Sequence, residues 1–368
     1  MSVVTTFTQE QVIQRAVQEI QSELAACQPK VVLYFASSSY NPQEIAHNME
    51  QAFPGATVFG CTTSGELISG KMSKNSIVAM GFTSDIIGDI NIQIVQKIST
   101  EDHVQEVFKG FEDYYHTPAL ELDPEKYVGI VICDGLTKAE EKIIDSIGNL
   151  TNVTFIGGSA GDDLKFASTY VFANGQAYSN AALLALLKPI SKFDFIKTQS
   201  FNPTNKALVA TKVDEANRVV IEFDHKPAVE AYAEAIGHSV DSVGNGFMSH
   251  PLGLMIDDEP YVRSPQQVND GAITFYCNVK EGMEMSVLES TDIIADTTAV
   301  IEEKQAEVGS IKAIVNFNCI LRTLQLDSQG TSEQYGKIFT HIPTIGFSTY
   351  GEAYIGHINQ TATMLIFF

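Results

Sequence analysis

The feature that most constrains the fold is an internal repeat of about one hundred residues. FGCTTSGEL at 59–67 lies over IGGSAGDDL at 156–164 without a gap, and IGFSTYGEA at 345–353 matches the first segment at Gly346, Thr349, Gly351 and Glu352. A period of this length is too long for a solenoid. The sequence therefore predicts a globular fold that uses one supersecondary unit several times.

Each copy of the unit is predicted to contain a strand, a helix, a second strand and two further strands. In the first copy these are Val31–Ala36, a helix that begins at Asn41-Pro42 and runs through Ala52, Ala56–Gly60, and strands near Glu66–Ser69 and Ser76–Phe82. The second copy has Tyr127–Cys133, Thr137–Gly148, Val153–Gly157, and strands that flank Asn174-Gly175, a strong hairpin signal. The third has Ala313–Asn318 and strands near Glu352–Gly356 and Thr361–Phe368.

The predicted fold class is α/β (α+β), with repeated β-α-β-β-β units that form packed mixed sheets and with helices outside. Residues 9–26 place Val12, Ile13, Ala16, Ile20 and Leu24 on one stripe, which predicts an amphipathic opening helix. A looser fourth copy is predicted from Val219 through a helix at Pro227–Ile236 to residues 250–290.

Composition narrows the possible partners and the compartment. The 368 residues favour two domains, and Lys+Arg 23 against Asp+Glu 45 gives a formal net charge of −22, which disfavours nucleic acid and anionic lipid. Five scattered cysteines without a CxxC pair indicate reduced thiols. No secretory signal is visible, and the run Ala181–Leu187 is too short to span a membrane. We expect a soluble, cytoplasmic protein.

In each repeat a strand enters a polar turn that carries glycine and ends in an acid, namely Glu66, Asp163 or Glu352. Glycine permits a positive backbone torsion there. The acids either shape the turns by accepting from backbone donors or contribute to a site. For Glu66 and Asp163 the structural role is the simpler interpretation.

Several motifs, in order along the chain, resemble the FIST family. VVLYFASS and FPGATVFGCTTSGEL resemble its N-terminal domain, and HPLGLMIDDEPYVRSP (250–265), FNCILR (317–322), IGFSTYGE and HINQT (357–361) resemble its C-terminal domain. The resemblance covers the chain from about Pro29 and implies a FIST N-terminal domain at 29–221 and a FIST C-terminal domain at 222–368, which leaves residues 1–28 as the N-terminal helix predicted above.

The resemblance also implies a function. The family is described as an intracellular sensory module for small ligands such as amino acids, and it is often joined to histidine kinase, cyclic-dinucleotide or chemoreceptor output modules. Some members are described as haem-dependent nitric oxide sensors. We therefore expect a sensor rather than an enzyme, acting through a separate signalling partner, with no cofactor or, alternatively, with haem b.

The third repeat contains the residues best suited to hold a ligand. Arg322 follows a buried strand just past Cys319, and Glu352 ends the turn of the neighbouring strand. Because ligands of open α/β sheets bind at the carboxyl ends of the strands, the two side chains are predicted to share one rim. An arginine grips a carboxylate and an acid accepts from an ammonium, so the pair would suit an amino acid. The alternative is a buried ion pair without a ligand.

Other polar residues of the family-like segments are weaker candidates for the same site. Arg263 lies in YVRSP and either joins the pocket or pairs with a surface acid. Asn318 and Asn359 are candidates to fix polar groups of a ligand, although capping and turn roles are common for asparagine. Cys319 contributes either to the pocket or only to the apolar core.

Two further hypotheses name other residues. Haem needs an axial ligand in an apolar pocket, and His250 is the candidate because it opens the family-like segment SHPLG. Gly157, Ser159 and Gly161 fit G-x-S-x-G, the nucleophile elbow of α/β-hydrolases. That elbow requires a helix directly after the serine, whereas Ala167–Ala173 is predicted to be a strand, so a serine hydrolase is the less favoured alternative.

Overall fold

The computed structural model describes residues 2–257, 259–354 and 356–368, and the chain folds into two compact units. The first contains residues 1–197, 297–357 and 362–368, and the second contains residues 198–296 and 358–361. The fold is mixed α/β, as predicted. The domains predicted from the sequence, 29–221 and 222–368, are continuous segments, whereas both compact units are discontinuous in sequence. The sequence-based division stays a prediction.

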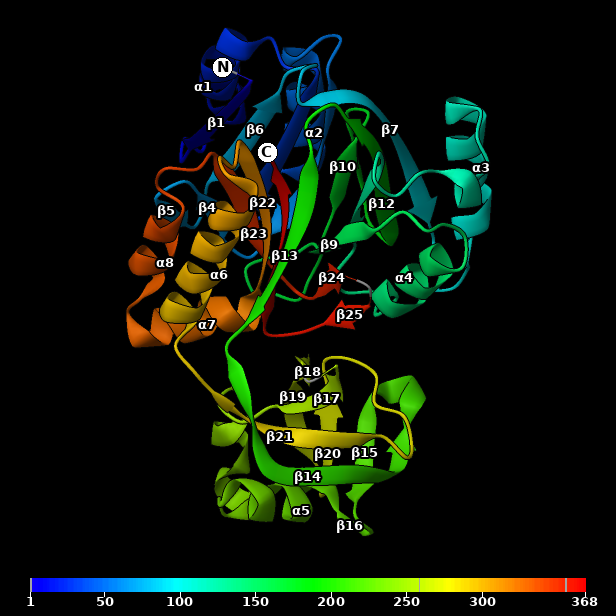
Figure 1. The fold of residues 1–368 in the computed structure, drawn as a ribbon, viewed down its shortest axis with the longest axis vertical. Helices are drawn as coiled ribbons and strands as arrows, with labels where there is room; N and C mark the ends of the chain where they lie inside the picture. The colour runs from blue at the N-terminus through cyan, green and yellow to red at the C-terminus, as the bar shows by residue number, and fades with distance from the viewer. Residues whose placement is uncertain (1, 258, 355) are drawn as a thin grey trace. The chain divides into compact units, whose positions relative to one another are not determined.

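The first unit is built from three copies of one motif, β-α-β-α-β-β-β-β, and repeat three has one additional helix, α8 (Figure 1). Repeat one contains β1 (Val3–Thr8), α1 (Ile13–Leu24), β2 (Val31–Ser37), α2 (Pro42–Ala52), β3 (Thr57–Thr63), β4 (Glu66–Ile68), β5 (Lys71–Ser73) and β6 (Ile77–Phe82). Repeat two contains β7 (Ile87–Gln96), α3 (Val104–Tyr115), β8 (Val128–Cys133), α4 (Glu140–Gly148), β9 (Phe155–Ser159), β10 (Val171–Ala173), β11 (Gln176–Tyr178) and β12 (Ala181–Pro189). Repeat three contains β13 (Phe193–Gln199), α6 (Ile293–Val308), β22 (Ala313–Cys319), α7 (Ile320–Gln329), α8 (Ser332–Ile338), β23 (Thr344–Thr349), β24 (Glu352–Tyr354), β25 (His357–Ile358) and β26 (Thr361–Phe367).

The predicted strand–helix–strand core of each copy is confirmed, but the repeat is longer than the sequence indicated. An opening strand and helix precede each predicted unit. In repeat one the hairpin of β4 and β5 stands where one short strand was expected, and the hairpin predicted at Asn174-Gly175 in repeat two is confirmed as β10 and β11. Helix α1 buries Ile13, Ala16, Ile20 and Leu24 as predicted. The prediction for Val12 is wrong, because this residue is the N-cap of α1 and is 47% exposed.

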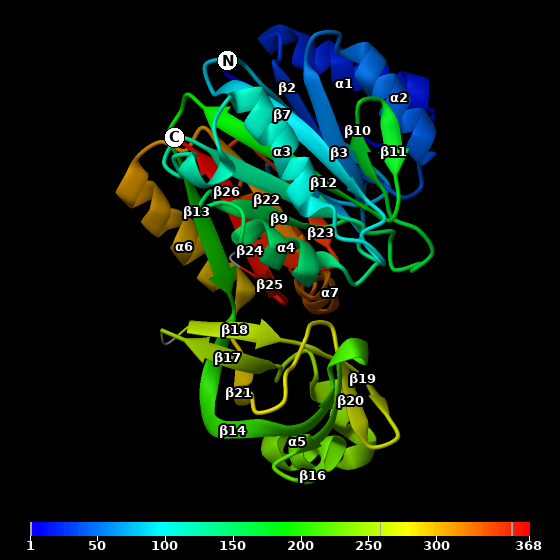
Figure 2. The same ribbon diagram turned by 90° about the vertical axis from the view of Figure 1, so that its right-hand side faces the viewer.

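The three repeats exchange their hairpins, as the sheet orders show. The sheets run β1-β6-β2-β3-β10-β11, β7-β12-β8-β9-β24-β25 and β13-β26-β22-β23-β4-β5. Each sheet therefore holds four strands of one repeat and the hairpin of another. Figure 2 shows one such hairpin, β10 and β11 of repeat two, beside β3 of repeat one. Within each sheet one pair is parallel, namely β2 with β3, β8 with β9, or β22 with β23. The repeats form one folding unit because none of them completes its own sheet.

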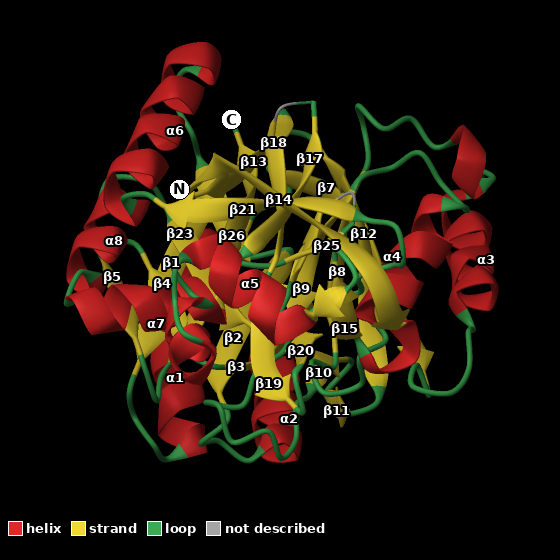
Figure 3. Cartoon of the chain, turned by 90° about the horizontal axis from the view of Figure 1, so that it is seen from below, coloured by secondary structure: helices red, strands yellow, loops and turns green. Residues whose placement is uncertain are grey.

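The main hydrophobic core is shared by the three sheets. Leu33 of β2, Ile130 of β8 and Val315 of β22 belong to one buried cluster. The opposite faces of the strands pack against helices, and in repeat one Val32, Tyr34 and Ala36 contact α1 and α2 by this route. Figure 3 shows the helices of this unit lying around its strands, as predicted.

A glycine at the same register position of each repeat allows the parallel pair to form. Gly60, Gly157 and Gly346 lie opposite Tyr34, Val131 and Asn316. A Cβ at these glycines would lie 1.7, 1.7 and 2.2 Å from the carbonyl oxygens of those residues. No other residue type fits, which explains why FG, IG and IG recur at this point of the sequence.

The second unit interrupts repeat three between β13 and α6. It contains β14 (Phe201–Asp214), β15 (Val219–Phe223), β16 (Lys226–Pro227), α5 (Ala228–Ile236), β17 (Leu252–Ile256), β18 (Glu259–Arg263), β19 (Pro265–Asn269), β20 (Ala272–Phe275) and β21 (Glu284–Ser290). Its strands form one sheet, β18-β17-β21-β14-β15-β20-β19, and β15 pairs antiparallel with β14, β16 and β20.

The predicted fourth copy is therefore wrong. A repeat would have placed a parallel strand beside β15 after α5, but the neighbours of β15 are all antiparallel. A strand followed by an amphipathic helix is too general a pattern to identify the motif. Among the described residues, no helix has the length and apolar character needed to cross a membrane.

The glycine constraint predicts a large difference between two substitutions in repeat two. Gly157→Ala should lower the free energy of unfolding by about 3 kcal/mol or prevent folding, because the new methyl group overlaps the Val131 carbonyl. Gly148→Ala, at the end of α4, meets nothing within 4 Å and should change stability by less than about 1 kcal/mol. Urea unfolding followed by circular dichroism measures both, and equal midpoints would contradict the packing argument.

Candidate functional site

The three polar turns that follow β3, β9 and β23 meet one another. Between the first and third turns, Ser64 N donates to Ser348 O at 3.3 Å and Ser348 N donates to Gly65 O at 2.8 Å. Gly161 N donates to Thr62 O at 3.0 Å, and Ser159 N donates to Gly351 O at 2.9 Å. Each turn is thus bonded to the other two. This follows from the hairpin exchange, because in each repeat the chain leaves its own sheet at this turn and continues into the hairpin that joins another sheet.

Two of the three turn acids have the structural role that the sequence favoured. Glu66, which is 1% exposed, accepts from the Thr63 hydroxyl and from both the backbone N–H (3.2 Å) and the hydroxyl (2.6 Å) of Ser76. Asp163 accepts from the hydroxyls of Ser37 (3.2 Å) and Ser38 (2.6 Å). Both carboxyl groups therefore hold neighbouring chain segments in place.

The environment of Glu66 favours its neutral form. Burial raises the pKa of this carboxyl group to about 7, against the lowering effect of the hydrogen bonds from Ser76 and Thr63, and the charge of Asp163 adds to the rise. A carboxyl group at the meeting point of the turns therefore titrates near neutral pH.

The third turn acid, Glu352, is fully buried at the start of β24, where its backbone pairs with that of Gly158 in β9. Beside it, the Thr349 hydroxyl lies 2.9 Å from Ser159 O and 2.8 Å from Gly351 O. Glu352 thus lies on the hairpin that repeat three contributes to the sheet of repeat two.

Arg322 is buried at the start of α7, directly after β22, and two neutral side chains accept hydrogen bonds from its guanidinium group. Its Nε donates to Asn318 Oδ1 at 3.1 Å and its Nη2 donates to Thr297 Oγ1 at 3.0 Å. The side chain is 1% exposed, and the guanidinium carbon lies 5.9 Å from the centre of the Tyr335 ring. Predicted residues Asn318 and Arg322 are thus brought together.

A wider network of buried polar groups surrounds this pair. Tyr335 OH donates to Asn318 Oδ1 at 3.1 Å, Asn318 Nδ2 donates to Thr323 Oγ1 at 3.0 Å, and Thr323 lies 2.7 Å from the Ser348 hydroxyl. Asn316 Nδ2 donates to Tyr335 OH at 3.3 Å, and Asn316 Oδ1 has no hydrogen-bond partner among the described residues. We call the set Thr297, Asn316, Asn318, Arg322, Thr323, Tyr335 and Ser348 the polar layer.

The two asparagines of the polar layer are specific to repeat three. By strand register, the position of Asn316 corresponds to Tyr34 and Val131, and that of Asn318 corresponds to Ala36 and Cys133. In repeats one and two these positions belong to apolar clusters that pack on the helices. At these two positions the motif is therefore stable with apolar side chains, and the two asparagines of repeat three are not required by the fold.

The other predicted ligand-binding residues belong to several elements of the two units. Cys319 is the last residue of β22, the N-cap of α7, and 1% exposed. Arg263 ends β18 in the second unit, where its Nη1 donates to Val262 O at 3.4 Å. Asn359, also assigned to the second unit, is 1% exposed.

The sequence missed Thr297, Thr323, Tyr335 and Ser348 as members of the site. One signal was visible: the strand AIVNFNC carries asparagine at two alternate positions of an otherwise apolar run. Alternate residues of a strand share one face, so the two amides had to point the same way. The helices that cover this face could not be identified from the sequence.

The surroundings of Ser159 differ from a nucleophile elbow. Strand β9 ends at Ser159, and the chain continues through residues 160–170 without a helix until β10 begins at Val171. The predicted strand from Ala167 is thus shorter than expected. Ser159 is 3% exposed, and its N–H and C=O both bond to the Thr349 hydroxyl.

The residues around His250 do not fit a haem group. Its Nδ1 lies 2.9 Å from the Ser249 hydroxyl, its ring centre is 6.2 Å from that of His238, and its carbonyl accepts from Tyr232. A histidine that binds haem iron must direct a ring nitrogen into an apolar pocket large enough for the haem. The His250 ring instead lies beside the polar side chains of Ser249 and His238. Within the described residues, no group of three or more His, Cys, Asp or Glu side chains is placed to hold a metal ion.

The fold and the polar layer define a repeat-built α/β protein with a buried arginine at the carboxyl end of a strand. Comparison with known families agrees with this class: the FIST N domain matches residues 30–226, and the FIST C domain matches residues 228–354. The chain belongs to the FIST family, whose domains are small-ligand sensory domains in signal transduction.

One relative among curated proteins is an uncharacterized protein of Methanocaldococcus jannaschii. It is 25% identical over 289 residues, which cover 72% of this chain and 54% of the relative. The chain thus spans about half the length of the curated relative it matches. The two family models meet near residue 227, inside the second compact unit.

The pKa of Glu66 predicts how stability depends on pH. Because the folded-state pKa is raised, protonation of Glu66 stabilises the fold below about pH 4.5, and this stabilisation is lost as the pH rises through about 7. Glu66→Gln should remove this dependence. Relative to that variant, the wild type should lose up to about 3 kcal/mol of unfolding free energy between pH 5 and 8.

Urea unfolding at several pH values measures this difference. The control is Glu333→Gln, because Glu333 is an exposed glutamate whose pKa is lowered by its ion pair with Lys337. A wild type and a Glu66→Gln variant with parallel pH profiles would contradict the account of Glu66.

Proposed function

We propose that this protein senses a small carboxylate, such as an amino acid, and that Arg322 is the anchor for the carboxylate group. The observation that supports the proposal most is the restriction of Asn316 and Asn318 to repeat three. Repeats one and two place members of apolar clusters at these two positions, so the asparagines beside Arg322 serve a purpose other than folding.

The chemistry of the polar layer suits an anionic ligand. The bonds from Arg322 to Asn318 and Thr297 use neutral acceptors and fix the plane of the guanidinium group. A pre-oriented guanidinium group binds a carboxylate bidentately with little loss of side-chain entropy. Each charge-assisted hydrogen bond contributes about 1.5–3 kcal/mol.

Under this proposal, Glu352 accepts from the ammonium group of an amino acid, and Asn318 and Cys319 position the ligand. Arg263 and Asn359 stay sequence predictions, and the proposal does not depend on them. Ligand binding shifts an equilibrium between two conformations of the sensor, and a signalling partner reads the result. A histidine kinase, a cyclic-dinucleotide enzyme or a chemoreceptor is the class of partner we propose. We also propose that the protein works without haem and is not a catalyst.

The proposal predicts a ligand-dependent rise in thermal stability that depends on Arg322. Among the twenty amino acids and small dicarboxylates, at least one should raise the unfolding free energy by about 2.7 kcal/mol at one hundred times its Kd. Arg322→Lys keeps the charge but loses the planar fork, and should weaken that ligand by about tenfold or more. Calorimetric titration of the folded protein gives the affinities.

Two further variants make this test decisive. Thr297→Val preserves the side-chain shape but removes one partner of Arg322, and should also weaken binding. Arg15→Lys changes an exposed arginine on α1 and should leave the affinity unchanged. A ligand that binds folded Arg322→Lys and Thr297→Val as tightly as the wild type would refute the role of Arg322.

Haem binding is tested by absorbance. The purified protein, before and after addition of haem, should show no protein-bound Soret band, because the groups around His250 are polar. A saturable Soret band that His250→Ala abolishes would make haem the ligand and overturn this part of the proposal.

A further inference from the structure

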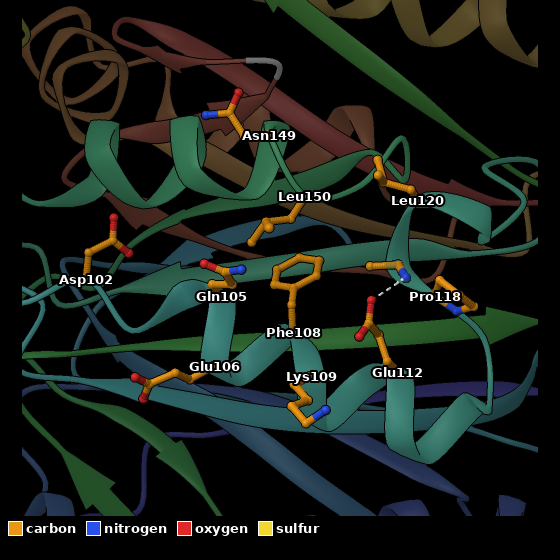
Figure 4. A pocket seen from close by; sticks show the side chains of 11 residues that line it. Asp102, Gln105, Glu106, Phe108, Lys109, Glu112, Pro118, Leu120, Asn149 and Leu150 are labelled. Carbon is orange, nitrogen blue, oxygen red and sulfur yellow. Dashed lines mark hydrogen bonds between the residues drawn. The ribbon is translucent and has the colours of Figure 1, made fainter.

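A groove of about 560 Å³ lies on repeat two, between α3 and the segments around residues 118–120 and 149–150 (Figure 4). It is separate from the polar layer, which belongs to repeat three. Its residues come from α3 and three connecting segments, those that hold Asp102, residues 118–120 and residues 149–150, and the sheet of repeat two supports all of them.

The floor of the groove is apolar. Phe108 of α3 is 3% exposed, and its ring packs against Phe111 and Phe155. Leu150 also lines the groove, and Leu120 stands at its edge with 63% of its surface exposed. An exposed leucine beside an apolar floor offers contact area to a partner.

The rim of the groove is mainly acidic. Asp102, Glu106 and Glu112 line it, together with one cation, Lys109. Glu112 accepts from Ala119 N at 2.9 Å, as drawn in Figure 4, and Asp102 accepts from the Ser146 hydroxyl at 2.8 Å. Glu106 is largely exposed, with 77% of its side chain accessible. Three carboxylates and one ammonium give the rim a net negative charge.

Repeat one shows that the motif does not require such a groove. There the two helices are bridged directly, with Gln14 Nε2 2.7 Å from Glu44 Oε1 and Gln21 Nε2 2.6 Å from Ala52 O. In repeat two the carboxylate of Asp102, just before α3, accepts a hydrogen bond from Ser146 of α4, and the groove opens between α3 and residues 149–150. Repeat two therefore differs from repeat one in how its two helices meet.

We propose that this groove binds a segment of a partner protein that carries lysine or arginine beside large apolar side chains. The apolar floor receives the leucine or phenylalanine side chains, and the acidic rim pairs with the cations. The net charge of −22 on the whole chain favours encounter with such a basic segment. An apolar stripe flanked by cations is typical of an amphipathic helix that lies in a groove.

The biological role of this groove rests on the proposed function, because a sensor acts through a partner protein. The contact itself involves no residue of the polar layer. Failure of ligand binding at Arg322 and failure of peptide binding at the groove are therefore separate outcomes.

The test uses the full-length protein and a fluorescein-labelled peptide, LKKLLKKLLKKL, with LEELLEELLEEL as the acidic counterpart. We expect saturable binding of the basic peptide in fluorescence anisotropy, at least about tenfold tighter than the acidic peptide. Glu106→Lys should weaken it by about tenfold, and Leu120→Ser should weaken it by about fivefold.

The matched control is Asp113→Lys, which makes the same charge change on an exposed residue of α3 that does not line the groove. This variant should bind the basic peptide within about twofold of the wild type, as should Arg322→Lys. If Asp113→Lys and Glu106→Lys weaken binding of the basic peptide equally, the peptide is attracted only by the net charge of the protein, and the proposal is overturned. Self-association in sedimentation that Glu106→Lys abolishes would assign the groove to a second copy of this chain and also overturn it.

Discussion

The exchange of hairpins among the three sheets is the constraint on which the rest of the structure depends. Strands β3, β9 and β23 would each be an open edge, and each is covered by a hairpin from another repeat through β10, β24 or β4. Hairpins with strands of two or three residues are not stable alone, so each depends on the sheet that receives it. The exchange brings the three polar turns together, and it accounts for the burial of Glu66 and Glu352 at those turns.

Three equivalent repeats also provide an internal standard for function. Where all three agree, as at Gly60, Gly157 and Gly346, the feature is explained by packing. Where one differs, the fold alone does not explain it. The two asparagines beside Arg322 in repeat three and the open groove of repeat two are two such differences. In repeat three the second unit is inserted directly before α6, and Thr297 on α6 bonds to Arg322. The element that resumes repeat three after the insertion thus carries a partner of the proposed anchor.

Much of the repeat could be predicted from the sequence because its signals are local. Buried strands such as Val31–Ser37 appear as continuous apolar runs, and Asn41-Pro42 marks the start of α2, where Asn41 caps the helix through Glu44 N. The hairpin exchange could not be predicted. Strand β4 pairs with β23, nearly 280 residues away, and nothing in a segment as short as Glu66–Ile68 specifies its neighbour.

The candidate site was predicted only in part, because some of its contacts are local in sequence and others are not. Asn318 and Arg322 are four residues apart at a strand–helix junction, so their contact is local and could be expected. Thr297 and Tyr335 reach the same guanidinium group from α6 and α8, and only tertiary packing brings them there. The fourth repeat was predicted wrongly because a strand–helix pattern says nothing about whether the next strand is parallel or antiparallel.

Hydrogen exchange measured by mass spectrometry, with and without a bound carboxylate, tests the central claim most directly. The account predicts that the ligand slows exchange in residues 316–323 and 344–349. It should leave unchanged the equivalent segments 34–41 and 58–63 of repeat one and 131–138 and 155–160 of repeat two. Protection in repeat one or two, with none around Arg322, would show that the polar layer of repeat three is not the ligand site.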